Sequence, residues 1–320
     1  MLPSRWSPRS RPPRCYRLGG IFIIAACALN ALRPHRLGGF PSILVGVFTS
    51  YGPESAARRR AIFDTWLSSP TPGIEFRFVI GEQDHRDGLW TLAEVQQQCA
   101  PHRVLHIPSI TDTYSNLPLK TAAFIAAVVS TRVSSRSLRY IIKVDDDVYF
   151  RPAAVPVSMA RWTAAEADYI GCLKSGLIET RPGYKWTEPK AQLFGDGATY
   201  PLHAWGSAYA ISAPLAVSIA AMHATGVGLR FLANEDVSTG VWALALGARF
   251  LDDHHLCAPS CAGAALAVWD YPACTGLCHP ETGQRQLHAL ANCTADISPL
   301  LSATAEDKDP QLAPFYSTLE

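Results

Sequence analysis

The chain has 320 residues, of which 48% are hydrophobic and 17% are charged. This composition excludes global disorder and predicts a sizeable core in one large or two ordinary domains. The formal net charge of +1 is too small for a general nucleic-acid-binding protein, so we expect no nucleic-acid partner.

The start of the chain differs in composition from the rest. Arginines crowd residues 1–17, and no acidic residue occurs before Glu54. Residues 18–32 form an apolar block that is shorter than the roughly 20 residues of a usual membrane span. A signal anchor, a signal peptide cleaved near Ala26-Cys27-Ala28 and an organelle transit peptide all fit this block. We favour an anchor between a basic cytosolic tail and a short stem at 33–42, which leaves the remainder in an oxidising lumen.

The chain from residue 43 to residue 145 alternates short apolar runs with helical patterns. Short β-branched runs predict strands at 43–49, 76–80, 104–107 and 140–145. Apolar residues that follow a helical period predict helices at 55–67, 90–99 and 119–133. This rhythm predicts an α/β fold with a Rossmann-like, doubly wound nucleotide-binding half.

Three consecutive acidic residues, Asp145-Asp146-Asp147, directly follow the last of these strands. Adjacent carboxylates repel one another unless a cation or hydrogen bonds compensate. Ligands of such sheets bind at the carboxyl ends of the strands, and carboxylates suit Mg²⁺ or Mn²⁺. The tripeptide therefore indicates a metal site for a phosphorylated ligand, with a solvated turn or helix cap as the alternative.

The chain after about residue 151 is less regular and is rich in aromatic residues. It predicts a second half, continuous with the first, whose rings and loops suit a sugar, although ordinary packing accounts for most single rings. A second acidic pair, Glu235-Asp236, precedes a helix predicted at 241–248. This pair fits either a helix N-terminal cap or a general base that faces the metal site.

Five of the nine cysteines fall late in the chain, in a Cys-rich extension at 257–293. Two C-x3-C spacings fit a zinc site, but disulfides are the expected use in a lumen. We expect Cys99 to remain unpaired. Asn292-Cys293-Thr294 is a glycosylation sequon whose use would compete with a disulfide at Cys293, and residues 294–320 are predicted to be loosely ordered.

Several sequence blocks occur together at a spacing that is typical of one enzyme family. They are Arg58-Arg59-Arg60 with Thr65-Trp66, Asp112-Thr113-Tyr114 with Lys120-Thr121, Lys143-Val144-Asp145-Asp146-Asp147-Val148, Gly206 with Tyr209, Asn234-Glu235-Asp236-Val237, and Cys274-Thr275-Gly276-Leu277-Cys278. With these blocks the chain resembles the β-1,3-galactosyltransferase family, whose members are inverting, metal-dependent Golgi enzymes of the GT-A fold, and in particular its plant-type branch.

The resemblance implies a catalytic GT-A domain at 43–256 and roles for individual residues. Metal binding is implied for Asp145, Asp147 and a late histidine, for which His254, His255 and His279 are candidates and we take His254. Asp236 is the implied base, with Glu235 second. Donor binding is implied for the remaining positions: Arg59, Asp112, Lys120, Asp146 and Gly206.

The same resemblance implies the reaction and the compartment. Galactose would pass from UDP-galactose, with Mn²⁺, to a hydroxyl of a glycan or glycoprotein acceptor, inside the Golgi, by a single-pass type II membrane enzyme. Another donor such as UDP-N-acetylglucosamine, a catalytically silent partner of an active transferase, and a carbohydrate-binding module are alternatives. The silent partner is suggested by Phe63, which stands where the family usually has arginine.

Overall fold

The computed structural model describes residues 42–84, 90–99, 104–132, 137–195, 197–295 and 297. The predictions for residues 1–41 and 298–320, which include the basic tail, the apolar block and most of the stem and final tail, lie outside these ranges. In the described part of the chain, no helix is both long enough and apolar enough to cross a membrane.

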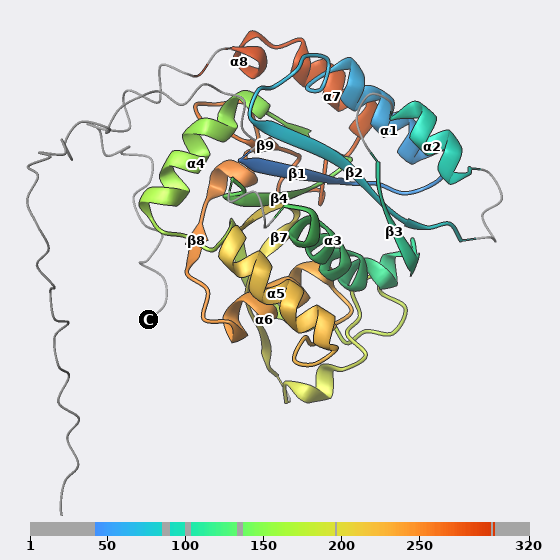
Figure 1. Cartoon of the computed structure of the whole chain (residues 1–320), viewed down its shortest axis with the longest axis vertical. Coiled ribbons are helices and arrows are strands. Elements are labelled where there is room, and N and C mark those ends of the chain that lie inside the picture. Colours follow the sequence, from blue (N-terminus) through green and yellow to red (C-terminus); the bar gives the residue numbers. More distant parts are fainter. Residues whose placement is uncertain are drawn as a thin grey trace, which may run out of the picture. The chain divides into compact units, whose positions relative to one another are not determined.

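A seven-stranded sheet forms the centre of the described residues (Figure 1). Its strands, in spatial order, are β3 (Val104–Thr111), β2 (Ile74–Glu82), β1 (Ile43–Phe48), β4 (Tyr140–Asp145), β7 (Thr199–Ser212), β6 (Tyr169–Leu177) and β8 (Phe250–Asp252). The first four are parallel, β7 is antiparallel to both of its neighbours, and β8 is parallel to β6. The predicted α/β fold is confirmed, and its two halves share one sheet.

Helices cover both faces of this sheet, as Figure 1 shows. They are α1 (Pro53–Asp64), α2 (Leu92–Gln98), α3 (Leu117–Arg132), α4 (Val155–Ala164), α5 (Ala213–Thr225), α6 (Glu235–Ala245), α7 (Pro280–His288) and α8 (Ala291–Thr294). The strands and helices predicted before residue 145 are all present, with ends shifted by a few residues. The helix predicted at 241–248 begins earlier, so Glu235 and Asp236 lie within its first turn instead of before it.

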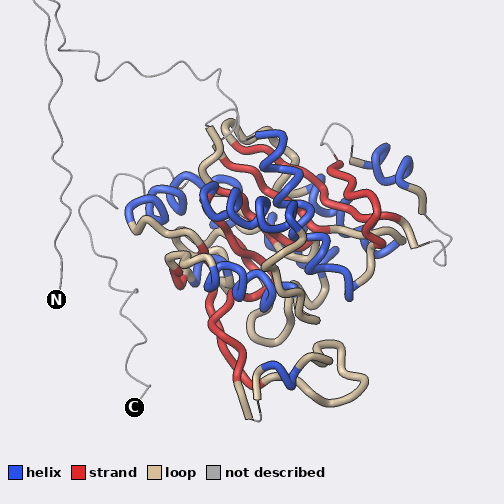
Figure 2. The backbone as a smooth tube through the Cα atoms, turned by 60° about the horizontal axis from the view of Figure 1, so that its bottom comes forward, coloured by secondary structure: helices blue, strands red, loops and turns tan. Residues whose placement is uncertain are grey.

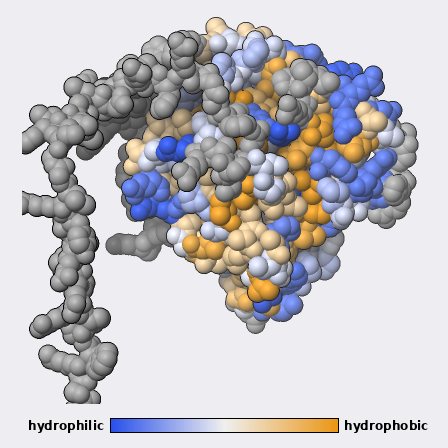
Figure 3. Space-filling view, in the orientation of Figure 1, coloured by the Kyte–Doolittle hydropathy of each residue, from blue (hydrophilic) through white to orange (hydrophobic). Residues whose placement is uncertain are grey.

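The strand β1 separates two hydrophobic cores. Ile43, Val45 and Val47 belong to the core that contains α1, α2 and α4, and Leu44 and Phe48 belong to the core that contains α3, α5 and α6. Strand side chains alternate between the faces of a sheet, so an uninterrupted apolar run is expected where both faces are covered. The apolar helix α3 packs against both the sheet and α5. Figure 3 shows apolar surface where α3 and α5 lie in Figure 1.

One disulfide links the second half to the Cys-rich extension, and two more lie within the extension. The pairs are Cys172–Cys257, Cys261–Cys293 and Cys274–Cys278. Cys99 is buried and free, as predicted. These cysteines therefore form disulfides in place of a zinc site, and Cys293 in the sequon is a disulfide partner. The extension also packs closely on the rest, because the short strand β9 (Ala267–Val268) pairs with β5 (Tyr149–Phe150) and α7 lies against α1.

The outer halves of β6 and β7 extend away from the sheet as a hairpin (Figure 2). The connecting loop, which includes the 3-10 turn η4 (Ala191–Leu193), returns to the body of the protein through several contacts. Glu188 accepts the backbone N–H of Ala233 at 2.8 Å, and the Asn234 side chain donates to the carbonyl of Trp186 at 3.1 Å. The loop is therefore fastened to the segment directly before α6.

Gly46 in the middle of β1 leaves the space that the ring of Phe124 on α3 occupies. A Cβ atom at this position would lie 2.4 Å from Phe124 Cζ. We predict that Gly46→Ala lowers the free energy of unfolding by about 1–3 kcal/mol, because an extra methyl group must displace a packed ring. Urea unfolding followed by circular dichroism measures this change.

Gly176→Ala is the matched control, because a Cβ atom there would meet nothing within 4 Å. Adding Phe124→Leu to Gly46→Ala should recover part of the lost stability. Equal stabilities of the two alanine variants would contradict this account of the β1–α3 contact.

Candidate active site

A pocket of about 640 Å³ opens at the carboxyl ends of β1 and β4. The register of the sheet pairs Phe48, the last residue of β1, with Asp145, the last residue of β4. The pocket wall includes every predicted site residue except Arg59 and His254: Asp112, Lys120, Asp145, Asp146, Asp147, Gly206, Glu235 and Asp236. Residues from both halves of the chain thus meet around one cavity.

Neighbouring groups compensate the charges of Asp145 and Asp146. Asp146 accepts hydrogen bonds from Thr49 Oγ1 at 2.7 Å and from Arg58 Nη1 at 3.2 Å. Asp145 Oδ1 lies 2.6 Å from Lys143 Nζ. Burial nevertheless raises the pKa of both carboxyl groups, because these partners only partly replace lost water.

Asp147 differs from the other two aspartates because its Oδ1 atom is buried without a hydrogen-bond partner among the described residues. Burial, followed by the neighbouring charges of Asp145 and Asp146, raises the pKa of Asp147 to about 7. A buried carboxylate oxygen without a partner is costly unless a cation or donor reaches it. The donor set of Asp145 and Asp147 therefore fits a hard divalent cation such as Mn²⁺.

Lys143 on β4 joins the two acidic clusters. Its buried ammonium lies 2.6 Å from Asp145 Oδ1 and 3.7 Å from Glu235 Oε2, and it also donates a hydrogen bond to the carbonyl of Gly206. Burial by itself would lower the pKa of Lys143, but the carboxylates of Asp145 and Glu235 outweigh burial and raise it. The lysine is therefore a fixed positive charge at the centre of the pocket wall.

The two acids of α6 have different surroundings. Glu235 is buried, and its Oε1 atom accepts hydrogen bonds from Tyr209 Oη at 2.5 Å and from Thr239 Oγ1 at 3.2 Å. Burial raises the pKa of Glu235, and the charge of Lys143 opposes that increase. The carboxylate of Asp236 is more accessible, lies beside Gly206, and is 3.2 Å from Lys174 Nζ. Asp236 is thus the acid of this pair that a ligand in the pocket can reach.

Asp112 and Lys120 lie in the pocket wall and bind each other. Lys120 Nζ is 2.9 Å from both carboxylate oxygens of Asp112 and also donates to the carbonyl of Thr49 at 2.8 Å. Asp112 Oδ2 accepts the backbone N–H of Gly81 at 2.8 Å. Burial lowers the pKa of Lys120, while the charge of Asp112 opposes that decrease. The pair connects the residues that follow β1 and β3 with the end of β2, so its role in the structure is to hold the pocket wall.

Two predicted site residues lie outside the pocket. Arg59 is fully buried behind the wall, where its guanidinium donates to Thr49 Oγ1, the carbonyl of Ser50 and Gln98 Oε1, and Arg58 lines the pocket instead. His254 is half exposed beside the Cys172–Cys257 disulfide, with Nε2 3.2 Å from Asp252.

His203, which the sequence analysis did not single out, lines the pocket and is buried. Burial lowers the pKa of its imidazole. Further pocket residues outside the predicted set are Trp205, whose ring lies 3.7 Å from Lys174 Nζ, and Trp186 in the β6–β7 loop. The excess of aromatic residues in this half was the sequence signal for them.

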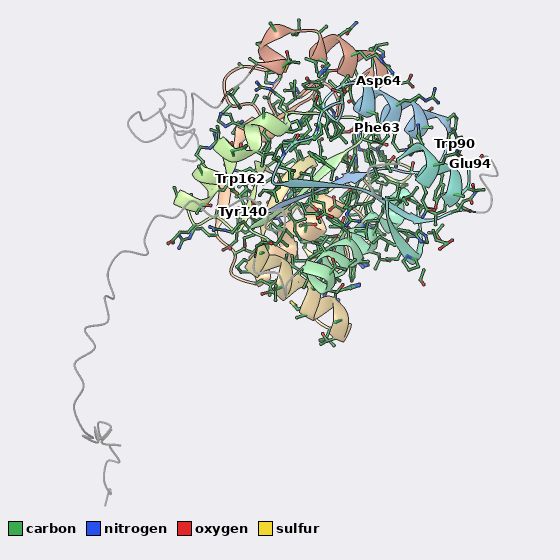
Figure 4. The ribbon with its side chains drawn as sticks, turned by 45° about the horizontal axis from the view of Figure 1, so that its top comes forward. Phe63, Asp64, Trp90, Glu94, Tyr140 and Trp162 are labelled. Carbon is green, nitrogen blue, oxygen red and sulfur yellow. A yellow bond between two sulfur atoms is a disulfide. The ribbon has the colours of Figure 1, made fainter. Side chains whose placement is uncertain are left out.

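Phe63 has no place in the pocket wall. Its ring packs against that of Phe78 on β2, with the two centroids 5.2 Å apart, and it belongs to the core under α1. Figure 4 labels Phe63 and Asp64 on α1, Trp90 just before α2 and Glu94 on α2, all on the same side of the sheet. Phenylalanine at this position therefore fills the core and removes no contact from the pocket of this chain.

Comparison with known proteins identifies relatives across most of the chain. A family profile described as galactosyltransferase matches residues 57–254, a segment that contains both acidic clusters. The chain is 35% identical over 284 residues to probable beta-1,3-galactosyltransferase 13 of Arabidopsis thaliana, covering 86% of this chain and 77% of that protein. Probable beta-1,3-galactosyltransferase 12 of the same plant is 35% identical over 259 residues, covering 78% and 66%. Beta-1,3-galactosyltransferase 7 is 29% identical over 274 residues, covering 78% and 67%.

The raised pKa of Asp147 predicts a pH dependence of stability in metal-free protein. In the folded protein the Asp147 carboxyl group keeps its proton up to a pH of about 7, whereas its ordinary pKa is 3.8. The folded state therefore binds more protons between these values, and its stability falls as the pH rises through them. Asparagine cannot ionise, so the stability of Asp147→Asn does not depend on this proton. Its free energy of unfolding relative to that of the wild type should therefore rise by on the order of 2–4 kcal/mol between about pH 5 and about pH 8.

Urea unfolding in EDTA at the two pH values measures this difference. Asp64→Asn, which alters an exposed carboxylate on α1, is the control and should show no such trend. A stability difference between Asp147→Asn and the wild type that is the same at both pH values would contradict the assignment.

Proposed function

Because this chain belongs to the galactosyltransferase family, we propose that it transfers galactose from UDP-galactose to a hydroxyl of a glycan or glycoprotein acceptor in β-1,3 linkage. It is a hexosyltransferase by its domain and its relatives. The observation that supports the proposal most directly is the meeting of Asp145 and Asp147 with Asp236 around one pocket. The first cluster can bind the diphosphate of a donor through a metal ion. An accessible carboxylate on the other side of the pocket can accept the proton of an acceptor hydroxyl.

Asp145 and Asp147 would hold Mn²⁺, with Asp146 fixed beside them by Thr49 and Arg58. The bound ion supplies positive charge that stabilises the diphosphate as it leaves the anomeric carbon. Lys143 prevents the two acidic clusters from repelling each other before any ligand enters. Arg58 and Lys174 add positive charge to the pocket wall, which suits an anionic donor.

Asp236 would accept the proton of the acceptor hydroxyl. Its carboxylate borders Gly206, where a Cβ atom would lie 3.6 Å from Asp236 Cβ, at ordinary contact distance. An acceptor oxygen activated on this side attacks the anomeric carbon opposite to the leaving diphosphate, which turns an α-linked donor into a β-linked product. Trp205 and Trp186 offer ring faces in the same wall, and such faces suit the apolar C–H surface of a sugar.

We also propose that the enzyme works in the Golgi lumen, held to the membrane by its N-terminal segment, in protein glycosylation. The disulfides among the described residues favour an oxidising compartment. The family to which the chain belongs supports a sugar donor and a glycan acceptor.

Release of UDP from a panel of UDP-sugars, with Mn²⁺ or with EDTA, tests the proposal. We expect Mn²⁺-dependent release from UDP-galactose, with transfer to an added glycan and a β-1,3 product identified by NMR. Asp147→Asn should abolish release, while Asp64→Asn should leave it unchanged. Preference for UDP-N-acetylglucosamine would replace the donor in the proposal, and no release from any donor would overturn it.

A comparison of the two acids on α6 tests which one is the base. Asp236→Asn should lower kcat by about 100-fold or more, which is the usual contribution of a general base. Glu235→Gln should keep most of the turnover, since its carboxylate is enclosed by Tyr209, Thr239 and Lys143. The larger loss of kcat in Glu235→Gln, at unchanged folding by circular dichroism, would reverse the assignment.

A further inference from the structure

A five-residue disulfide loop of the Cys-rich extension forms part of the pocket wall. The Cys274–Cys278 disulfide closes it, and Thr275 lines the pocket. The galactosyltransferase profile ends at residue 254, so this loop lies outside the segment that defines the family. The pocket of this chain is therefore completed by residues that follow the family domain.

Hydrogen bonds hold this loop between the two halves of the site. The backbone N–H of Leu277 donates to the carbonyl of Asp147 at 2.8 Å, and Ser207 Oγ, next to Gly206, donates to the carbonyl of Thr275 at 2.5 Å. On the far side, Asp270 bonds the loop at both Gly276 and Cys278. The loop is thus fixed to Asp147 on one side and to β7 on the other.

Gly276 lies directly against the carboxylate of Asp147. A Cβ atom at position 276 would come 2.3 Å from Asp147 Cγ and 2.5 Å from each of its carboxylate oxygens. The backbone conformation is open to any residue, because Gly276 is absent from the positions with positive φ. Space for the Asp147 carboxylate is therefore what glycine provides here.

A second contact from the extension supports the backbone of the acidic tripeptide. Gln284 on α7 is fully buried, and its Nε2 atom donates to the carbonyl of Asp146 at 3.0 Å. Its Oε1 atom accepts from Trp66 Nε1 at 3.0 Å. The peptide groups of Asp146 and Asp147 are therefore each held by one residue of the extension.

We propose that the disulfide loop 274–278 is a positioning element that orients the Asp147 carboxylate toward the pocket, with Gly276 and Leu277 as its positioning residues. The consequence for metal binding rests on the proposed function. Among the described residues, no group donates a hydrogen bond to the buried Oδ1 atom of Asp147, so the direction of this carboxylate depends on the surfaces that surround it. Opening the loop frees that side chain to turn, and a ligand carboxylate without its support binds metal more weakly.

The test compares full-length wild type with Gly276→Ala and with Cys274→Ser/Cys278→Ser. Gly283→Ala is the matched control, because it adds a methyl group in the same extension at ordinary distances, 3.4 Å from Leu277. Hydrogen exchange of peptides that span 145–150 and 275–279 is measured in EDTA. The affinity for Mn²⁺ in the presence of UDP is then measured by titration, and folding is checked by near-UV circular dichroism.

In both loop variants we expect faster hydrogen exchange in both peptides and an affinity for Mn²⁺ that is about 10-fold or more lower. Gly283→Ala should behave like the wild type in both measurements. Unchanged exchange and affinity in the loop variants would overturn the proposal. If the wild type bound no Mn²⁺ with UDP, the metal part of the proposed function would fail, and exchange in EDTA would still decide whether the loop holds Asp147. If Gly276→Ala does not fold, the serine variant decides both measurements.

Discussion

The buried ammonium of Lys143 is the charge on which the rest of the site depends. Asp145 and Glu235 come from distant parts of the chain, and two acidic clusters brought together without a cation would repel each other in a medium that screens poorly. Lys143 contacts both and also binds the carbonyl of Gly206. The pocket can therefore be assembled before any ligand arrives, and among the described residues only the Oδ1 atom of Asp147, of these acids, stays buried without a hydrogen-bond partner.

The order of strands explains how these groups meet. Strand β7 is antiparallel to β4, and its residue Tyr209 pairs with Lys143 in the sheet. The same strand contains Gly206, and the hydroxyl of Tyr209 binds Glu235 at the start of α6. One antiparallel strand beside the last parallel strand therefore joins the first half of the chain to the second. If β7 were parallel to β4, Gly206 would lie toward the other end of the sheet, away from the pocket.

Much of this arrangement could be predicted from the sequence, because its signals are local. The β-branched runs gave the strands, and three aspartates at the end of one run marked the pocket. What could not be predicted depends on direction and distance: Arg58 and Arg59 are neighbours in the chain, yet only the first faces the pocket. Ser55, Ala56, Arg59 and Ile62 are spaced along α1 with the helical period that is typical of a buried face. This spacing indicates an interior position for Arg59.

The histidine and the disulfide loop show a second limit of sequence reasoning. His254 follows β8 at the outer edge of the sheet, several strands from Asp145, and sequence spacing contains no information about that separation. In contrast, Gly276 is distant from Asp147 in the chain but touches it in space. Because β9 pairs with β5, which begins two residues after Asp147, the extension returns to this point of the fold. The contact between the disulfide loop and Asp147 is therefore a consequence of sheet pairing, and any change that loosens the β5–β9 pair should act on the Asp147 carboxylate as well.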